Sequence, residues 1–130
     1  MWCEKLAVEK GWVKGPHGRV ARLQQLHDAL WRAHRIVIDC GLHSGKLTHA
    51  SAAQMLVDGI GFTPARARAD VNWYTSQPTV PMSYLLGRLE LERVKARFVD
   101  GKGWPLRKFH DWILSHGAVP WAWIEQAAER

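Results

Sequence analysis

The residues best placed for chemistry lie in the stretch 32–45, which reads RAHRIVIDCGLHSG. With 3.6 residues per helical turn, charged side chains recur on one face, at Asp28, Arg32, Arg35 and Asp39. They would form surface ion pairs, Asp28 with Arg32 and Arg35 with Asp39, worth about 0.3 to 0.5 kcal/mol each. Alternatively, Arg32 and Arg35 bind a substrate carboxylate that Asp39 orients, with His43 along the same wall of a cleft. Spacing alone favours the ion pairs.

The same helix carries a second, apolar stripe. Its members are Leu23, Leu26, Leu30, Ala33, Val37 and Cys40. This spacing predicts that the apolar stripe faces the core and the charged stripe does not. Gly41 is predicted to end the helix, with Leu42 folding back over the stop.

Other catalytic patterns are absent from the sequence. The seven histidines include no HExxH motif and no pair at i, i+4 spacing, so no metal-ligand set is predicted. His27 and His34 are interpreted as histidines of the helix surface or the edge of the core. The sequence has no GxSxG elbow and no P-loop spacing, and Cys3 and Cys40 belong to no motif.

The basic character of the chain suggests a second class of function. The formal net charge is +6, and six cations crowd into residues 93–108 beside Phe98 and Trp104. Glu90, Glu92 and Asp100 interrupt this run, which favours a solvated helix surface over a nucleic-acid groove. A non-enzymatic basic helical module that binds nucleic acid or a protein partner remains the alternative.

The pattern of caps, glycines and prolines predicts an all-α fold of about seven helices in an irregular array. The predicted helices cover residues 2–13, 19–40, 48–58, 63–74, 81–99 and 105–116, with a last one from 119 or 120. At 130 residues and 47% hydrophobic content, residues 1–130 should form a single helical domain or part of one. No membrane partner is expected. The start lacks a signal-peptide pattern, so the cytoplasm is the default expectation unless a signal lies upstream.

The first helix begins without a capping residue, which suggests that the chain is a fragment of a longer protein. Motifs spread over the chain in order strengthen this expectation. They are Arg32 and Arg35, Asp39 with Gly41-Leu42-His43, Thr48, Tyr74 before Pro78, Ser83-Tyr84 with Gly87, Phe109-His110-Asp111, and Gly117-Ala118 with Pro120. On these residues the chain resembles the C-terminal third or so of the bacterial domain-of-unknown-function family 885. That family is similar to zinc metallopeptidases of the carboxypeptidase and thimet-like kind.

The resemblance implies a site and a cofactor. In the family, a His-Glu metal motif and a further glutamate lie upstream of the matching part, so zinc is implied for the full-length protein and no metal for this chain. Tyr74 and Tyr84 would then donate hydrogen bonds to a tetrahedral oxyanion, and Arg32, Arg35 and His43 would position a peptide substrate. The partner implied for this chain is the remainder of its own longer chain, without which it should be inactive.

The chain departs from the family pattern at three places. Leu47 replaces a tryptophan that is common after the Gly-Leu-His corner, and Trp73 replaces the arginine before the tyrosine. A Pro-Gly-Gln stretch becomes Pro78-Thr79-Val80. Each change could alter the specificity of the cleft that the resemblance implies.

Overall fold

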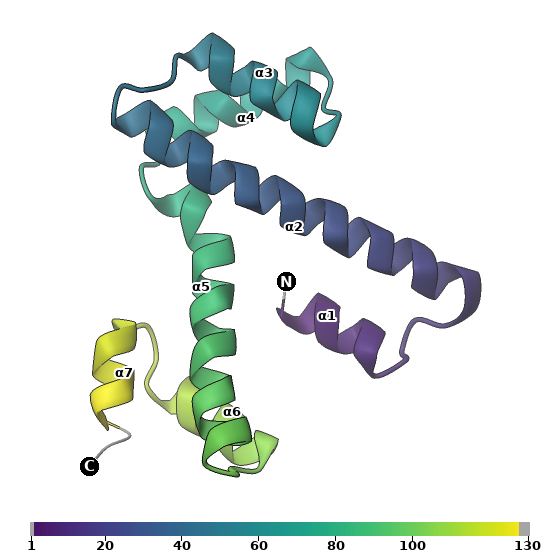
Figure 1. The fold of residues 1–130 in the computed structure, drawn as a ribbon, viewed down its shortest axis with the longest axis vertical. Coiled ribbons are helices and arrows are strands. Elements are labelled where there is room, and N and C mark those ends of the chain that lie inside the picture. The colour runs from purple at the N-terminus through teal and green to yellow at the C-terminus, as the bar shows by residue number, and fades with distance from the viewer. Residues whose placement is uncertain (1, 128–130) are drawn as a thin grey trace. The chain divides into compact units, whose positions relative to one another are not determined.

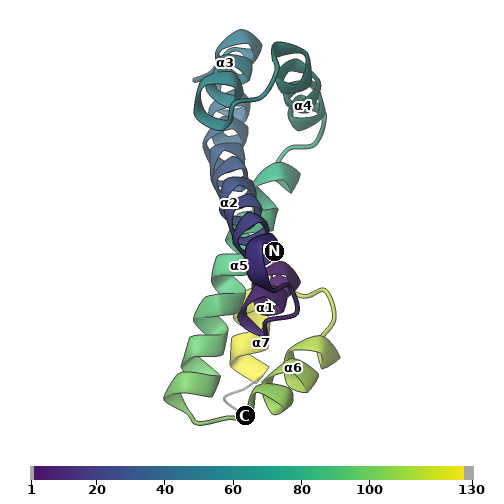
Figure 2. The same ribbon diagram turned by 90° about the vertical axis from the view of Figure 1, so that its right-hand side faces the viewer.

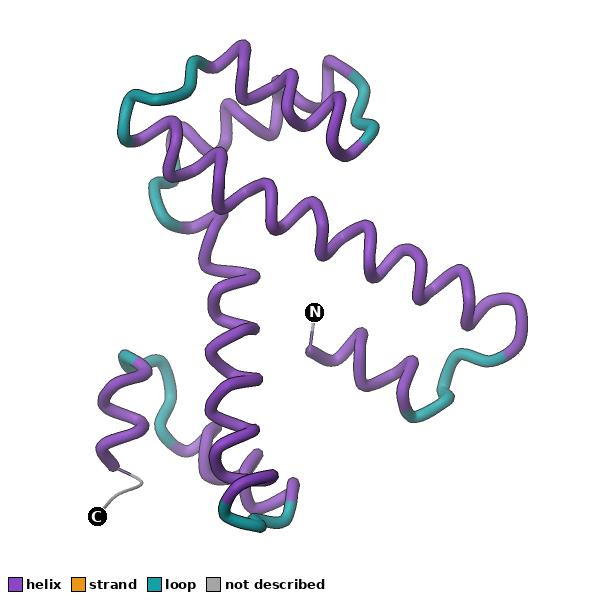
Figure 3. Tube along the Cα trace, viewed as in Figure 1, coloured by secondary structure: helices purple, strands orange, loops and turns teal. Residues whose placement is uncertain are grey.

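The computed structural model describes the backbone of residues 2–127 and the side chains of residues 3–127. In this part of the chain all regular structure is helical and no strand is present (Figures 1 and 3), which confirms the predicted all-α class. The elements are α1 (Trp2–Glu9), α2 (Gly15–His43), α3 (His49–Ile60), α4 (Pro64–Ser76), α5 (Val80–Lys95), a π-helix η1 (Ala96–Gly101), α6 (Leu106–Ser115) and α7 (Trp121–Ala127).

The contacts divide the chain into two compact units, one that ends at Leu86 and one that begins at Gly87. The first holds α1 to α4 and the start of α5, and the second holds the rest of α5 with η1, α6 and α7. This division does not test whether the chain is one domain, and the single-domain expectation stays a prediction. None of the described helices has both the length and the apolar character needed to cross a membrane.

In the first unit, α3 and α4 lie side by side against the C-terminal half of α2 (Figures 1 and 2). Their shared core is fully buried at Ile38 of α2, Leu56 of α3, and Val71 and Tyr74 of α4. Trp31 packs against the edge of this core. The C-terminal half of α2 is thereby fixed as the platform that carries the candidate site.

Local capping explains where α3 and α4 begin, as the sequence predicted. The hydroxyl of Thr48 accepts from the backbone N–H of Ser51, whose side chain in turn accepts from the N–H of Thr48, so the two residues form a capping box. The hydroxyl of Thr63 accepts from the N–H of Arg66 at 3.3 Å, and Pro64 occupies the first turn of α4.

The predicted ends of α2 were wrong at both termini. The helix begins at Gly15 rather than Arg19, because Pro16 fits the first helical turn instead of breaking it. It also runs past Gly41 to His43. Gly41 is needed for space, since a Cβ there would collide with the side chain of Leu47, and the left-handed residue of the helix stop is Gly45, at φ 71°.

The predicted orientation of α2 was also wrong. Leu23, Leu26, Leu30 and Val37 of the apolar stripe are exposed, whereas Arg35 and Asp39 of the charged stripe are buried. The burial is decided by tertiary packing. The helices α3 and α4 pack on a face of α2 centred on Trp31 and Ile38, and these two residues belong to neither stripe. The apolar stripe lies outside that contact.

The second unit has an aromatic core. Val94, Phe98 and Phe109 are fully buried in it. The rings of Trp104 and Trp112 each lie 5.0 Å from the ring of Phe98, centroid to centroid. Several of the tryptophans that are abundant in the sequence therefore serve packing.

Two residues in the left-handed region allow a matched test of backbone strain. Gly45 has φ 71° and Thr79, directly before α5, has φ 70°. Because a Cβ is unfavourable there by about 1 to 2 kcal/mol, Gly45→Ala should lower the free energy of unfolding by about 1 kcal/mol, whereas Thr79→Gly should raise it by up to about 1 kcal/mol. Urea denaturation of both variants measures this, and changes of the same sign would contradict the strain assigned to the two positions.

Candidate functional site

Four side chains from α2, α4 and α5 form what we call the Trp31–Arg35 cluster, with Tyr74 and Tyr84 as its other members. The guanidinium carbon of Arg35 lies 3.9 Å from the ring centroid of Trp31, 5.3 Å from that of Tyr84 and 5.7 Å from that of Tyr74. The indole N–H of Trp31 donates to the hydroxyl of Tyr74 at 3.0 Å. The cation is thus held against three aromatic rings, an arrangement that favours arginine.

The polar atoms of this cluster are incompletely satisfied. Arg35 is only 9% exposed, and its Nε is buried without a hydrogen-bond partner in the structure. Oδ2 of the neighbouring Asp70 is buried and unpartnered as well. Burial raises the pKa of Asp70, and the positive charges of Arg35 and Arg66 oppose this shift. Burial likewise raises the pKa of Tyr74. Such groups are typical of functional sites as well as of structural ion networks.

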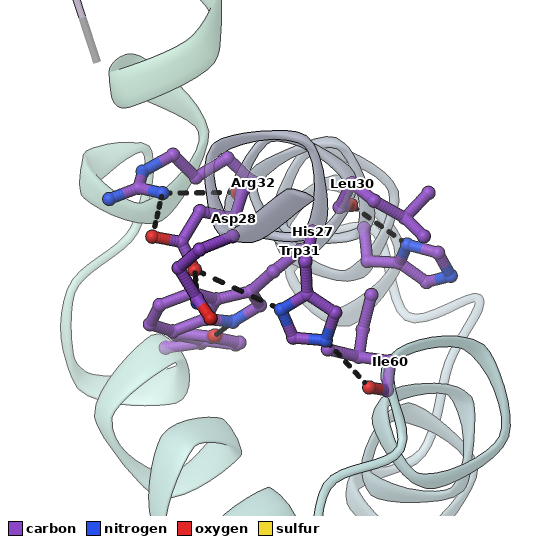
Figure 4. Close-up of polar contacts among 9 residues, drawn as sticks. His27, Asp28, Leu30, Trp31, Arg32 and Ile60 are labelled. Carbon is purple, nitrogen blue, oxygen red and sulfur yellow. Dashed lines mark hydrogen bonds and ion pairs between the residues drawn. The ribbon is translucent and has the colours of Figure 1, made fainter. Parts of the chain in front are cut away.

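Arg32 has a different environment. Its guanidinium donates to the backbone oxygen of Asp28 at 3.0 Å and lies 3.6 Å from the Asp28 carboxylate (Figure 4). The predicted Asp28–Arg32 ion pair is therefore present. Figure 4 also shows His27 against the backbone oxygen of Ile60, at 2.9 Å, which agrees with its interpretation as a histidine at the edge of the core.

Asp39 does not pair with Arg35 but anchors the start of α5. It is 2% exposed, and its two carboxylate oxygens accept from the backbone N–H groups of Thr79 and Met82, each at 3.3 Å. Nδ1 of His43 lies 2.8 Å from the same carboxylate. A carboxylate at this place satisfies N–H groups that the first helical turn leaves open and complements the positive end of the helix dipole.

The pKa of His43 is raised above its usual value. The main cause is the backbone oxygen of Asp39, 3.0 Å from Nδ1, and the Asp39 carboxylate adds to it. Desolvation acts in the opposite direction. The protonated imidazole is thus favoured next to the buried carboxylate.

The six residues predicted from the sequence fall into three places. Arg35, Tyr74 and Tyr84 come together in the Trp31–Arg35 cluster, Asp39 and His43 form a pair at the start of α5, and Arg32 pairs with Asp28. The sequence analysis missed Trp31 as a member of the cluster and Asp70 as its neighbour. The spacing contained a signal for both, because each lies one helical turn before a predicted residue, Arg35 and Tyr74 respectively.

The basic segment of the second unit is largely neutralised. Arg93 and Arg97 both contact the carboxylate of Glu125, and Arg93 also contacts Glu90. Lys95 lies 3.8 Å from Asp100. The ammonium groups of Lys102 and Lys108 lie over the rings of Phe98 and Trp104, at 4.7 and 4.2 Å. These contacts favour a solvated helix surface over a groove for phosphates.

The described residues do not form a metal-binding site. There, no three side chains of His, Cys, Asp or Glu lie close enough together to hold a metal ion. Both oxygens of the Asp39 carboxylate face donor groups, and Nδ1 of His43 is directed at Asp39. The zinc that the resemblance implies therefore does not fit these residues.

The fold and the site define an all-helical protein in which an arginine is held on aromatic rings beside a helix anchored by a carboxylate. The chain belongs to the family described as "Bacterial protein of unknown function (DUF885)", whose model matches residues 1–127. No curated protein and no solved structure matches the chain. Membership of family 885 is thus confirmed, and the family match carries no information on peptidase activity.

Removing the charge of Asp39 should loosen the start of α5. In Asp39→Asn, the amide NH₂ must face a backbone N–H or the imidazole, so one buried donor loses its acceptor and the charge is lost. We expect the free energy of unfolding to fall by about 2 kcal/mol. Asp58→Asn, on the exposed side of α3, is the matched control and should change it by less than about 0.5 kcal/mol. Equal effects of the two substitutions in urea denaturation would contradict the anchoring role.

The raised pKa of His43 predicts a pH-dependent contribution to stability. The folded protein binds this proton more tightly than the unfolded chain, so the contribution is fully present below the ordinary value of 6.5 and is lost as the pH rises through the folded pKa. The difference in unfolding free energy between the parent and His43→Gln should therefore be largest at acidic pH. A difference that grows towards alkaline pH would show the opposite shift.

Proposed function

We propose that this chain supplies substrate-positioning residues to a zinc-metallopeptidase-like protein of family 885 and that it does not hydrolyse peptides alone. The observation that carries the proposal is the Trp31–Arg35 cluster. It brings three predicted site residues, Arg35, Tyr74 and Tyr84, from three helices to one place. Nε of Arg35 and Nε of Arg32 are both buried without a hydrogen-bond partner, and Arg35 is the one of the two that lies against three aromatic rings.

In the proposed site, Arg35 binds a carboxylate of the peptide. Its ring contacts fix the plane of the guanidinium, which suits a planar, charge-assisted contact with a carboxylate. Tyr84 is 50% exposed beside it and is the better placed of the two tyrosines to donate to a substrate oxygen. Tyr74 is fully buried, and its hydroxyl accepts from Trp31, so in this arrangement it supports the cluster from behind.

The other predicted residues take supporting parts. Asp39 holds the first turn of α5 and thereby sets the position of Tyr84 one turn later, and His43 contacts the Asp39 carboxylate. Arg32 stays with Asp28. We place the zinc ligands outside these 130 residues, in the remainder of a longer chain, and no step of the proposal uses zinc.

The alternative, a basic module that binds nucleic acid or a protein through residues 93–108, has less support. Most of its cations already contact carboxylates or aromatic rings.

The side-chain Nε–H resonance of Arg35 tests carboxylate binding directly. Titration with acetyl-alanyl-alanine should shift this ¹⁵N–¹H signal, because a carboxylate bound at the guanidinium changes the electrostatic environment of Nε, and the C-terminal amide of the same peptide should shift it much less. Arg35→Gln should weaken binding by about tenfold or more. Arg32→Gln, one turn away on the same helix, is the matched control with little expected effect. Shifts that do not distinguish acid from amide would overturn the assigned role.

The same preparation tests the claim that this chain does not hydrolyse peptides by itself. With zinc added, the chain should take up no stoichiometric metal and should not cleave a panel of unstructured peptides. Zinc-dependent cleavage that survives repurification would contradict this part of the proposal and leave the carboxylate site intact.

A further inference from the structure

The apolar stripe of α2 forms an exposed seam along the helix. Leu23, Leu26, Leu30 and Val37 are 69%, 51%, 47% and 55% exposed, and Cys40 is exposed as well. With Ala33 between them, the six residues follow one another at steps of three, four, three, four and three. This is the spacing by which one helix packs its side chains into the holes of another. We call these six residues the α2 seam.

The neighbours of α2 in the first unit occupy other faces. The cavity between α1 and α2 is lined by Ala21, Gln24 and Asp28, which lie away from the seam. The packing of α3 and α4 uses Trp31 and Ile38. Within this unit, the seam is therefore left open to a partner helix.

At its C-terminal end the seam opens into a socket. A cavity of about 350 Å³ is bordered there by Val37, Cys40, Gly41, Leu47 and Met55, among others. Gly41 and Leu47 meet closely on one wall, and Met55 of α3 provides another. A largely apolar hollow of this size has room for leucine-type side chains of a packed helix, which enter such holes as knobs.

The charges that α2 places beside the seam have one sign, and Asp58 of α3 lies further along, at a neighbouring hollow lined by His34 and Met55. Arg19 and Arg22, both exposed, lie one turn before Leu23 and Leu26 on the same face, and Lys46 borders the socket. The two carboxylates of α2 are Asp28 and Asp39. Neither is spaced three or four residues from a seam residue, so both lie on the other side of the helix. A partner with acidic margins would complement this surface.

We propose that the α2 seam is the docking surface for an amphipathic helix from outside these 130 residues, with leucine-type side chains at the same spacing and acidic side chains along its margins. A second copy of the chain is a poorer fit, because two such seams would bring arginines together. An anionic membrane is also a poorer fit, because the seam is narrow, has small residues at Ala33 and Cys40, and ends in a socket. The proposal does not depend on the peptidase-like function.

The two exposed cysteines provide an internal readout, since Cys40 belongs to the seam and Cys3 lies on α1. The probe is a synthetic peptide of three heptads with leucine at positions a and d and glutamate at e and g, and its control has lysine at e and g. At saturation the glutamate probe should slow alkylation of Cys40 by about tenfold and leave Cys3 unchanged, as followed by peptide mass spectrometry, whereas the lysine control should protect Cys40 far less.

Variants distinguish specific binding at the seam from nonspecific hydrophobic adsorption of the peptide. Leu26→Gln should weaken the protection of Cys40 by about tenfold, and Leu114→Gln, at a still more exposed leucine on α6, should leave it unchanged. Arg22→Glu should shift the preference towards the lysine peptide. Because Leu26 and Arg22 are exposed, the variants should keep the helical circular dichroism of the parent.

Several outcomes would overturn the proposal. They are no protection of Cys40 by the glutamate probe, equal protection by both peptides, or equal effects of Leu26→Gln and Leu114→Gln. Protection by phosphatidylglycerol vesicles but not by the peptide would assign the seam to a membrane surface instead. If Cys40 became protected in the absence of a probe as the protein concentration rose, and light scattering gave the mass of a dimer, the seam would be assigned to a second copy of this chain.

Discussion

The structure of the first unit depends on the buried carboxylate of Asp39. The connection from α4 to α5 contains Pro78 and a left-handed Thr79, and Pro81 follows in the first turn of α5, so local sequence does not by itself fix where α5 begins. Asp39 fixes it from forty residues away, by accepting two backbone N–H groups at the start of the helix. Because Tyr84 follows within the next turn, its position beside Arg35 is a consequence of this anchor.

The burial of Arg35 affects the energetics of α2. Burying a guanidinium is costly unless its charge and donors find partners, and here three aromatic rings supply part of that compensation. An orphan Nε and the unpartnered oxygen of Asp70 remain. The cluster thus combines fixed ring contacts with unused hydrogen-bonding capacity, which is the combination that the proposed binding role requires.

The two stripes of α2 take the reverse of their ordinary places. Part of the charged stripe faces the protein, where Arg35 and Asp39 are buried, and the apolar seam from Leu23 to Cys40 faces away. This arrangement makes one long helix serve two contacts, an internal one with α3, α4 and α5 and an external one along the seam.

Much of the fold could be predicted from the sequence, because its causes are local. Thr48, Thr63 and Pro64 mark helix starts by hydrogen bonds and backbone angles within one turn, and the absence of strand patterns determined the all-α class. Periodicity also identified both stripes of α2 correctly as stripes. Which stripe is buried was decided only by tertiary structure, because periodicity gives the spacing of a face and not the neighbour that covers it. For the same reason spacing could pair Arg32 with Asp28 across one helical turn but could not pair Asp39 with Thr79 and Met82, or Arg35 with Tyr84, whose contacts join segments about forty to fifty residues apart.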